Sequence, residues 1–452
     1  MAAVTLASGL TVAGVLAVAG PAAADDDGTP RSQSGATAVT AGLKTFGEAV
    51  VHENGGDLKV AAGLFEMSVE GGGTLRTYGA DIHSPTQKDA KYEETPWSST
   101  SLGTNKNAGR IRWILQNSYP QVNDLAALGR QAGIRGLTEQ DAAAGTQVAI
   151  WRYSDGAAVD AVDPQAEKLA DYLHRRARDT AEPSASLTLD PPTVSGRPGE
   201  RVGPVTVHTN ARGVTVVPPA DAALSGVRIV DMAGRPLTSA KNGSRLYVEI
   251  PAQAADGSAE VTVQASTTVP VGRAFASASR SQVQILAGSS ESTVSATTNA
   301  GWAAQGAIPA LSARRNCAAG SVDLTAGNAG DKPFTFGLMD TEHTIPAGTS
   351  RIVTVPLQED QAYDFTITGP DGFQRRFTGV LDCRTMGAAG GAAVQTLSEP
   401  SPASVGGAAG GTDLAATGGS SATPLIVSVA IGLVVIGGGA LVLIRGRETT
   451  GD

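Results

Sequence analysis

The segment from Pro424 to Ile444 constrains this 452-residue chain most, because it contains no charged side chain. A helix over this range is about 30 Å long, which matches the hydrocarbon thickness of a bilayer. Arg445 and Arg447 follow directly, and positive charge beside a span orients that end toward the cytoplasm. The sequence therefore predicts a single C-terminal transmembrane helix over 424–444. A plain tail anchor is an alternative that fits the same pattern.

The opposite end of the chain has the pattern of an export signal. Residues 4–20 are apolar and uncharged, and the small residues 22–24 and the acidic run 25–27 follow. This order is typical of a secretory signal peptide, 1–24, which is cleaved between Ala24 and Asp25. Because no Lys or Arg precedes the apolar run, either the true start lies upstream or the amino terminus alone supplies the positive charge. An uncleaved N-terminal membrane anchor is the alternative.

The composition narrows the class of protein. The length fits about three domains. Glycine (56) and proline (24) are abundant and only 4% of residues are aromatic, which favours short strands and turns over a large enzyme core. The net charge of -9 gives no overall field that attracts nucleic acid. We therefore expect a multidomain protein that does not bind nucleic acid.

Two segments, 184–290 and 312–385, alternate apolar and polar residues between turns rich in Gly and Pro. Residues 246–250 and 363–367 are examples of this alternation. Such patterning predicts two all-β, Ig-like sandwiches. We expect residues 291–311 to connect them.

Cys317 and Cys383 lie near the start and the end of the second predicted sandwich. Two cysteines in an exported chain favour one disulfide. Closing a loop of this length stabilises a domain by roughly 4 kcal/mol in the chain-entropy model. Two free buried thiols are the alternative.

The N-terminal segment, 36–181, mixes helices and strands. Thr138 is placed to cap one helix, and Asp163 followed by Pro164 is a favourable start for another. Residues 58–83 have the pattern of strands around a Gly-rich turn. The sequence predicts an α+β domain that differs in type from the two sandwiches.

A sorting motif precedes the apolar span. Residues 386–412 are rich in Gly, Ala and Ser and predict a flexible linker. After Asp413, the chain continues with Leu414, Ala415, Ala416, Thr417 and Gly418. They resemble the sortase pentapeptide of Gram-positive wall proteins in the L-A-x-T-G form of many actinobacteria, and 414–447 has that family's order of pentapeptide, apolar span and basic tail. The resemblance implies that a sortase cuts the Thr417–Gly418 bond and transfers the Thr417 acyl group to peptidoglycan.

A second resemblance lies in the N-terminal segment. Residues 146–151 read Thr-Gln-Val-Ala-Ile-Trp, and this run is similar to the T-Q-x-A-x-W motif of thioester domains in Gram-positive surface proteins. Residues 62–65 and 77–83 resemble the first motif of that family, so the likeness covers roughly 36–181. It implies the family's fold and a place on the cell surface. In the family, a cysteine after the Tyr of the first motif joins the motif's Gln in an internal thioester, which a surface amine can attack.

This sequence departs from the family at the cysteine. Gly79 follows Tyr78, and both cysteines of the chain lie in the predicted sandwich. Gln147 is therefore present without its sulfur partner, and the resemblance no longer implies covalent adhesion. We expect Gln147 to be a polar residue hydrogen-bonded to backbone near a buried Trp151.

No other motif predicts chemistry. The five histidines have no metal-ligand spacing, and no nucleophile or phosphate-binding motif is present. We predict no catalytic residue, no metal and no cofactor. Asp81, His83 and the pair Glu93-Glu94 are expected on the surface.

These expectations combine into one hypothesis. The chain is a secreted, sortase-anchored cell-wall protein of adhesin-like type with a degenerate thioester domain, held in the membrane before processing. Its partners are sortase, peptidoglycan through Thr417, and an unidentified surface or host protein. The alternative is a structural surface stalk with no specific ligand. A secreted enzyme would need a nucleophile and a base in a polar cleft, which the sequence does not offer.

Overall fold

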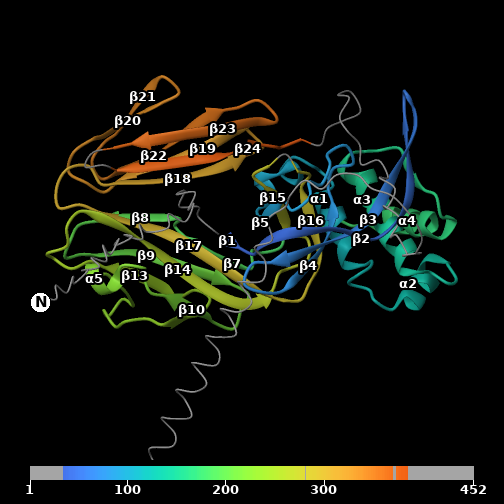
Figure 1. Ribbon diagram of the computed structural model, residues 1–452, viewed down its shortest axis with the longest axis horizontal. Helices are drawn as coiled ribbons and strands as arrows, with labels where there is room; N and C mark the ends of the chain where they lie inside the picture. Colours follow the sequence, from blue (N-terminus) through green and yellow to red (C-terminus); the bar gives the residue numbers. More distant parts are fainter. Residues whose placement is uncertain (1–33, 280, 370–372, 385–452) are drawn as a thin grey trace, which may run out of the picture. The chain divides into compact units, whose positions relative to one another are not determined.

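The computed structural model describes residues 34–279, 281–369 and 373–384, which are mostly β-strands with a few helices (Figure 1). The predicted signal peptide (1–24), linker (386–412) and sorting signal (414–447) lie outside these residues. Across the described part of the chain, no helix is both long and apolar enough to cross a membrane. The described residues belong to one compact unit, Met1–Ser398.

The first structural region is built on a seven-stranded antiparallel sheet in the order β3-β4-β16-β15-β5-β2-β6. Its strands are β2 (Thr37–Glu53), β3 (Gly56–Val69), β4 (Thr74–Gly79), β5 (Lys91–Thr95), β6 (Val159–Ala161), β15 (Ala274–Ser277) and β16 (Gln284–Ser289). Because β2 also pairs with β3, six of these strands form a closed ring of pairings. Closure leaves few free strand edges and encloses side chains on the inner face.

Helices cover part of this sheet. They are η1 (Trp97–Ser99), η2 (Ser101–Gly103), α1 (Ala108–Gln116), α2 (Leu125–Ala132), α3 (Glu139–Ser154) and α4 (Pro164–Arg176). As predicted, Thr138 caps α3, where it forms a capping box with Asp141. Asp163 caps α4 by accepting a hydrogen bond from the backbone N of Gln165 at 2.7 Å, and Pro164 occupies the first turn.

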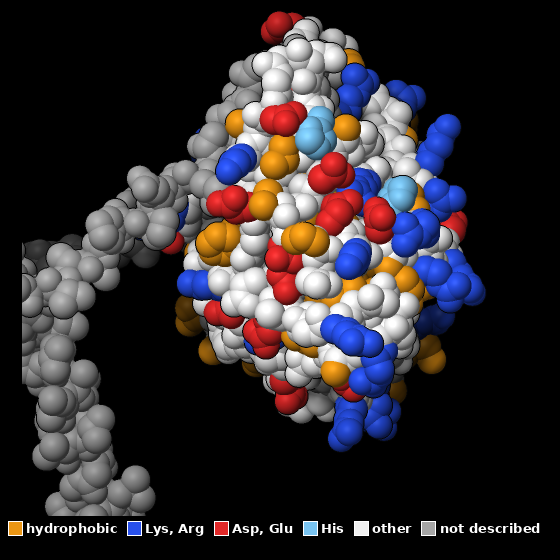
Figure 2. All heavy atoms as spheres, turned by 90° about the vertical axis from the view of Figure 1, so that its right-hand side faces the viewer, with side chains coloured by type: hydrophobic (Ala, Val, Ile, Leu, Met, Phe, Trp, Pro, Cys, Tyr) orange, Lys and Arg blue, Asp and Glu red, His pale blue; other side chains and the backbone are white. Residues whose placement is uncertain are grey.

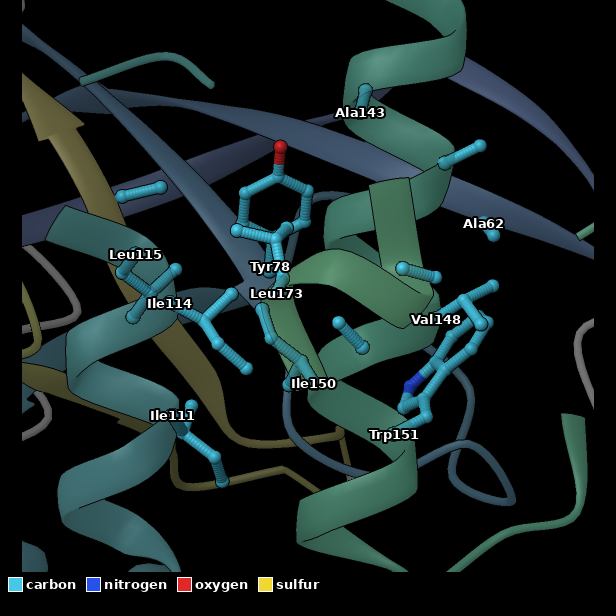
Figure 3. Close-up of a cluster of buried hydrophobic side chains, with 14 of the residues drawn as sticks. Ala62, Tyr78, Ile111, Ile114, Leu115, Ala143, Val148, Ile150, Trp151 and Leu173 are labelled. Atoms are coloured by element: carbon cyan, nitrogen blue, oxygen red, sulfur yellow. The ribbon is translucent and has the colours of Figure 1, made fainter. Parts of the chain in front are cut away.

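Small residues let α3 lie deep in the core. A Cβ added to Gly145 would lie 2.4 Å from the carbonyl oxygen of Ala166, so the absence of a side chain allows α4 to approach α3 closely. Figure 3 shows Ile111 of α1, Tyr78 of β4 and Trp151 of α3 within one apolar cluster. The buried part of the first region thus holds α3, and with it the Thr-Gln motif, against β2 and β3.

The second region has two sheets, ordered β1-β17-β14-β10-β12, with β8 parallel to β17, and β11-β13-β9-β7. Their elements are β1 (Ser34–Gly35), β7 (Leu187–Asp190), β8 (Thr193–Gly196), β9 (Arg201–Thr209), β10 (Val214–Val217), α5 (Ala222–Ser225), β11 (Arg228–Val230), β12 (Ser239–Ala240), β13 (Arg245–Glu249), β14 (Gly257–Thr268) and β17 (Glu291–Trp302). Buried valines and leucines of both sheets share one core, which continues to Met67 and Phe275 of the first region.

The strand pairings differ from the predicted segment boundaries. Residues 184–290 do not form one sandwich, because their last two strands, β15 and β16, complete the sheet of the first region. Residues 291–311, predicted as a connector, contain β17, which pairs with β14 over its whole length. Alternation along a strand indicates which face is buried but not which strand lies beside it. The first region therefore needs residues far beyond 181.

The third region consists of a three-stranded sheet, β18-β19-β22, and two hairpins. Its strands are β18 (Pro309–Asn316), β19 (Ser321–Asn328), β20 (Phe334–Leu338), β21 (Thr341–Ile345), β22 (Thr349–Pro356), β23 (Gln361–Thr368) and β24 (Gln374–Leu381). Phe334 and Phe336 lie in its core. The predicted disulfide is confirmed, since Cys317 and Cys383 are bonded, with 5.0 Å between their Cα atoms. An Ig-like strand order for the sandwiches stays a prediction.

Removing the disulfide with the double substitution Cys317→Ser and Cys383→Ser should lower the free energy of unfolding of the third region by about 2–4 kcal/mol, because the bridge closes a loop of 66 residues. Denaturant unfolding of the purified protein measures this change. Reduction of the wild-type protein should give the same shift, while reduction of the double variant should have no effect. An unchanged midpoint would show that the bridge does not stabilise the folded state.

Candidate functional site

Gln147 lies in the middle of α3 with 0% of its surface exposed. The residues of α3 around Gln147 are themselves buried and mostly small, and the hydroxyl of Thr146 donates to the carbonyl of Ala142 at 2.6 Å. A buried carboxamide must find partners for both its oxygen and its nitrogen. Those partners are supplied by a residue 68 positions earlier in the chain.

That residue is Gly79, at the end of β4. The backbone N of Gly79 donates to Oε1 of Gln147 at 3.0 Å, and Nε2 of Gln147 donates to the carbonyl of Gly79 at 2.9 Å. The two positions that the thioester resemblance pairs are therefore in contact. Both the oxygen and the nitrogen of the Gln147 side-chain amide are hydrogen-bonded to backbone atoms of Gly79. These two bonds link α3 to the end of β4.

Two aromatic residues are near the pair in the chain, since Tyr78 precedes Gly79 and Trp151 lies one turn of α3 after Gln147. Tyr78 is fully buried, its hydroxyl donates to the carbonyl of Tyr119 at 2.9 Å, and burial raises its pKa well above the ordinary value. Trp151 is buried in the same cluster, as the sequence predicts, and its indole nitrogen has no hydrogen-bond partner among the described residues (Figure 3). A phenol that stays neutral offers no charged base near the Gln147 amide.

A residue that the sequence did not single out lies against Gly79. A Cβ added to Gly79 would lie 1.8 Å from Oε1 and 2.7 Å from Cδ of Gln282. Gln282 precedes β16 and is 2% exposed, and within the described ranges its Oε1 is without a hydrogen-bond partner. The volume that a side chain at position 79 would need is thus already filled.

A second glutamine, Gln284 at the start of β16, behaves differently. Gln284 accepts a hydrogen bond from the hydroxyl of Thr77 at 2.9 Å, and its Nε2 donates to Oγ1 of Thr86 at 3.1 Å. Gln282 and Gln284 alternate with Val283 and Ile285 in an apolar run. Two glutamines two residues apart in such an apolar run are the signal that sequence reasoning missed, since buried polar residues need an explanation.

Asp81 and His83 are buried, so the expectation that they lie on the surface is wrong. One carboxylate oxygen of Asp81 accepts from the backbone N of His83 at 2.8 Å, and the other accepts from Oγ of Ser84 at 2.6 Å. Burial and, next, the charge of Asp81 raise the pKa of Asp155 well above its ordinary value. These hydrogen bonds lie within the loop after β4, whereas the side-chain amide of Gln147 is hydrogen-bonded to the backbone of Gly79.

Glu94 is also buried, at 5% exposure, so the expectation of a solvated Glu93-Glu94 pair is wrong for Glu94. Its carboxylate pairs with Nε of Arg273 at 2.8 Å, accepts from the backbone N of Ser186 at 2.9 Å and that of Ala36 at 3.2 Å, and also accepts from the hydroxyl of Ser186. Nη1 of Arg273 reaches Glu182 at 3.0 Å. This charged junction ties β5 and β15 to the segment that leads into β7.

The outer face of α3 carries Arg152, which pairs with Asp160 at 2.9 Å, Glu167 at 2.6 Å and Asp171 at 3.0 Å. Figure 2 shows acidic and basic side chains intermixed on the face of the molecule that it presents. A mixed surface of this kind does not steer one sign of ligand.

Three carboxylates gather after β22 and β24. Glu359, Asp360 and Asp382 bring oxygens within 4.8 Å of one another. Burial raises the pKa of Asp382 to about 7, and the charges of Asp81, Glu359 and Asp360 add to this rise. An acidic cluster alone does not identify a metal site.

The raised pKa of Asp382 predicts a pH dependence. The folded protein holds a proton that the unfolded chain, with an Asp pKa of about 3.9, has released. Stability from this group is therefore complete below about pH 4 and decreases as the pH rises through about 7. Asp382→Asn should remove this decrease and raise the melting temperature at about pH 8 relative to wild type.

A matched control for this prediction is Asp364→Asn. Its carboxylate is exposed and bonded to Arg376, whose hydrogen bond lowers its pKa, so its stabilising effect is lost as the pH falls. That loss falls below about pH 4, so between about pH 4 and 8 the melting temperature of Asp382→Asn should rise with pH relative to wild type, while Asp364→Asn should differ from wild type by a constant amount. Parallel curves for Asp382→Asn and wild type would contradict the assignment.

Two family models match separate segments of the chain. Residues 76–179 match the family model described as Thioester domain. Residues 309–380 match the model described as Bacterial phospholipase C, C-terminal domain. The second match covers β18 to β24, for which the sequence predicted a sandwich without naming a family. No curated protein matches the chain.

Solved structures give weaker likenesses. The Bacillus anthracis TIE protein matches with a TM-score of 0.28 and 14% identity over 77% of this chain and 64% of that chain. The thioester domain of the Enterococcus faecium TIE86 protein matches with a TM-score of 0.28 and 15% identity over 60% of this chain and 95% of that one. The E. coli chaperone DraB matches with a TM-score of 0.17 and 14% identity over 43% of this chain and 98% of that one.

Likenesses with TM-scores this low are not evidence about the site. The chain also spans less than two thirds of the length of the first of these proteins. The family match carries more weight, because the matched residues include Gly79 and Gln147, which the structure brings into contact. Residues 76–179 are therefore similar to the thioester domain family, and this similarity indicates a surface protein of adhesin-like type.

Proposed function

We propose that this chain is a sortase-anchored cell-wall surface protein whose thioester-like domain forms no thioester and engages its partners without a covalent bond. The observation that carries the proposal is the contact between Gln147 and Gly79. The Gln of the family's motif lies beside the position of the family's cysteine, and that position has no side chain.

The chemistry follows from the atoms at that position. A thioester needs a thiol that can attack Cδ of Gln147 and displace ammonia, and the backbone amide of Gly79 offers no such nucleophile. The two cysteines of the chain are bonded to each other in the third region. The amide of Gln147 therefore stays intact, and recognition of a partner rests on surface contacts.

The anchor is proposed from the sequence after the described residues. The pentapeptide Leu414 to Gly418, the apolar span and the basic tail support transfer of the Thr417 acyl group to a peptidoglycan amine. The three β-rich regions then lie between this anchor and the cell surroundings. In this arrangement the bond at Thr417 is the covalent attachment of the protein to the wall.

Cell fractionation tests the anchor. Wild-type protein should be recovered covalently bound to peptidoglycan, while Thr417→Ala should shift it to the membrane fraction with the C-terminal segment uncleaved. Ser401→Ala, in the predicted linker, serves as the control and should behave as wild type. Equal recovery of wild type and Thr417→Ala in the membrane fraction would indicate a plain tail anchor.

A binding experiment tests non-covalent recognition. The ectodomain, residues 25–412, must be used, because residues 36–181 alone lack β15 and β16. Bound ectodomain should be released from target cells by denaturant. An adduct that survives boiling in detergent would contradict the proposal, and the absence of binding to every surface would favour a structural stalk.

A further inference from the structure

We propose that Gln282 is the residue that excludes a side chain from position 79, so that Gly79 and Gln282 form a complementary pair and a cysteine at position 79 alone cannot restore an acyl-transfer site. This inference rests on the proposed function, since it concerns the same contact between Gly79 and Gln147. It adds a positioning residue that comes from a distant part of the chain.

The geometry at Gly79 supports this assignment. The three atoms nearest to an added Cβ all belong to Gln282: Oε1 at 1.8 Å, Cδ at 2.7 Å and Nε2 at 3.2 Å. Gly79 does not have a positive φ, so the backbone itself accepts an ordinary L-residue. The obstacle to a side chain at position 79 is therefore the carboxamide of Gln282.

Gln282 cannot move away as a unit. Its backbone N donates to the carbonyl of Pro85 at 3.2 Å, and its carbonyl accepts from the hydroxyl of Tyr92 at 3.1 Å. With the backbone held on both sides and the residue 2% exposed, only a rotation of the side chain within a packed interior could free the space. The far end of a buried side chain can rotate only into space that its close-packed neighbours leave.

The unpaired oxygen of Gln282 supports a space-filling role. Among the described residues, Oε1 of Gln282 has no hydrogen-bond partner, although buried polar atoms are normally satisfied. Gln284, two residues on, is bonded at both ends of its amide to Thr77 and Thr86. The side-chain oxygen of Gln282 therefore fills the volume beside Gly79 and makes no hydrogen bond within the described residues.

If Gln282 is truncated and position 79 carries a thiol, we expect an intramolecular reaction that needs no other reagent. The sulfur attacks Cδ of Gln147, the bond from Cδ to Nε2 breaks, and the nitrogen leaves as ammonia with the thiol proton. The product is a thioester between residues 79 and 147. Methylamine would then attack the same carbon, form an amide and return the free thiol.

Intact-mass analysis of the ectodomain tests this proposal with the variants Gly79→Cys, Gly79→Cys/Gln282→Ala and Gly79→Cys/Gln284→Ala. Only Gly79→Cys/Gln282→Ala should lose the mass of one ammonia and take up methylamine at Gln147. The Gln284 variant is the matched control, because it truncates a neighbouring glutamine whose amide is bonded away from position 79. Ammonia loss in Gly79→Cys alone, or its absence from folded Gly79→Cys/Gln282→Ala, would overturn the role of Gln282.

A thermal measurement keeps the proposal testable if the cysteine variants fold poorly. Gly79→Ala should lower the melting temperature by about 5 °C, as overpacking does. Adding Gln282→Ala to this variant should recover at least half of that loss. Additive effects of the two substitutions would overturn the proposal. Ammonia loss in the wild-type protein would instead contradict the proposed function, so the two failures are distinguishable.

Discussion

Glu94→Ala should lower the free energy of unfolding by about 3–5 kcal/mol, because it removes one partner of a buried ion pair. Within the described ranges, Arg273, 4% exposed, would keep only Glu182 as a charged partner. The backbone N–H groups of Ala36 and Ser186 would also lose their acceptor. Denaturant unfolding at neutral pH, followed by the fluorescence of Trp97 and its neighbours, measures the change.

Two further variants show whether burial is the cause. Glu70→Ala removes an exposed pair with Lys91 at 2.9 Å and should change stability by at most about 1 kcal/mol. Glu94→Ala combined with Arg273→Met should be less destabilising than the sum of the single changes, because no unpaired charge is left buried. Equal effects of Glu94→Ala and Glu70→Ala would contradict this account of the junction.

Gln147→Ala should lower the free energy of unfolding by about 2–6 kcal/mol. It leaves the N–H and the carbonyl of Gly79 buried without a partner, and each such group costs about 1–3 kcal/mol. A thioester-forming residue would instead be expected to tolerate substitution with loss of the covalent bond alone. Chemical denaturation of the purified ectodomain, with the slope checked for two-state unfolding, measures the effect.

Gln140→Ala is the matched control for Gln147→Ala. Gln140 lies in the first turn of the same helix, and its side chain is exposed. Its replacement should change stability by at most about 0.5 kcal/mol, as is usual at the surface. If both substitutions had the same small effect, the amide of Gln147 would not hold β4 to α3.

Local signals in the sequence predicted local features of the structure well. Thr138 and Asp163 cap helices because their side-chain oxygens accept from backbone N–H groups a few residues on. The disulfide between Cys317 and Cys383 followed from their number and the expectation of export. Each of these predictions needs only neighbouring residues or a count.

Features that depend on distant strands were not predictable in the same way. Nothing in the alternation of residues 274–289 shows that β15 and β16 pair with β5 and β4. The missed burial of Glu94 has the same cause, since its partner Arg273 is 179 positions away. The sequence predicted that Gln147 lacks a sulfur partner, and only the strand pairing brought Gln282 to the place where that partner would lie.

The mass of the intact wild-type ectodomain, residues 25–412, shows directly whether Gln147 keeps its amide. We expect the mass of the sequence with one disulfide, no loss of ammonia at Gln147 and no change after incubation with methylamine. A mass lower by one ammonia that maps to Gln147, or a methylamine adduct at that residue, would show that the site forms a reactive acyl bond and would contradict the account.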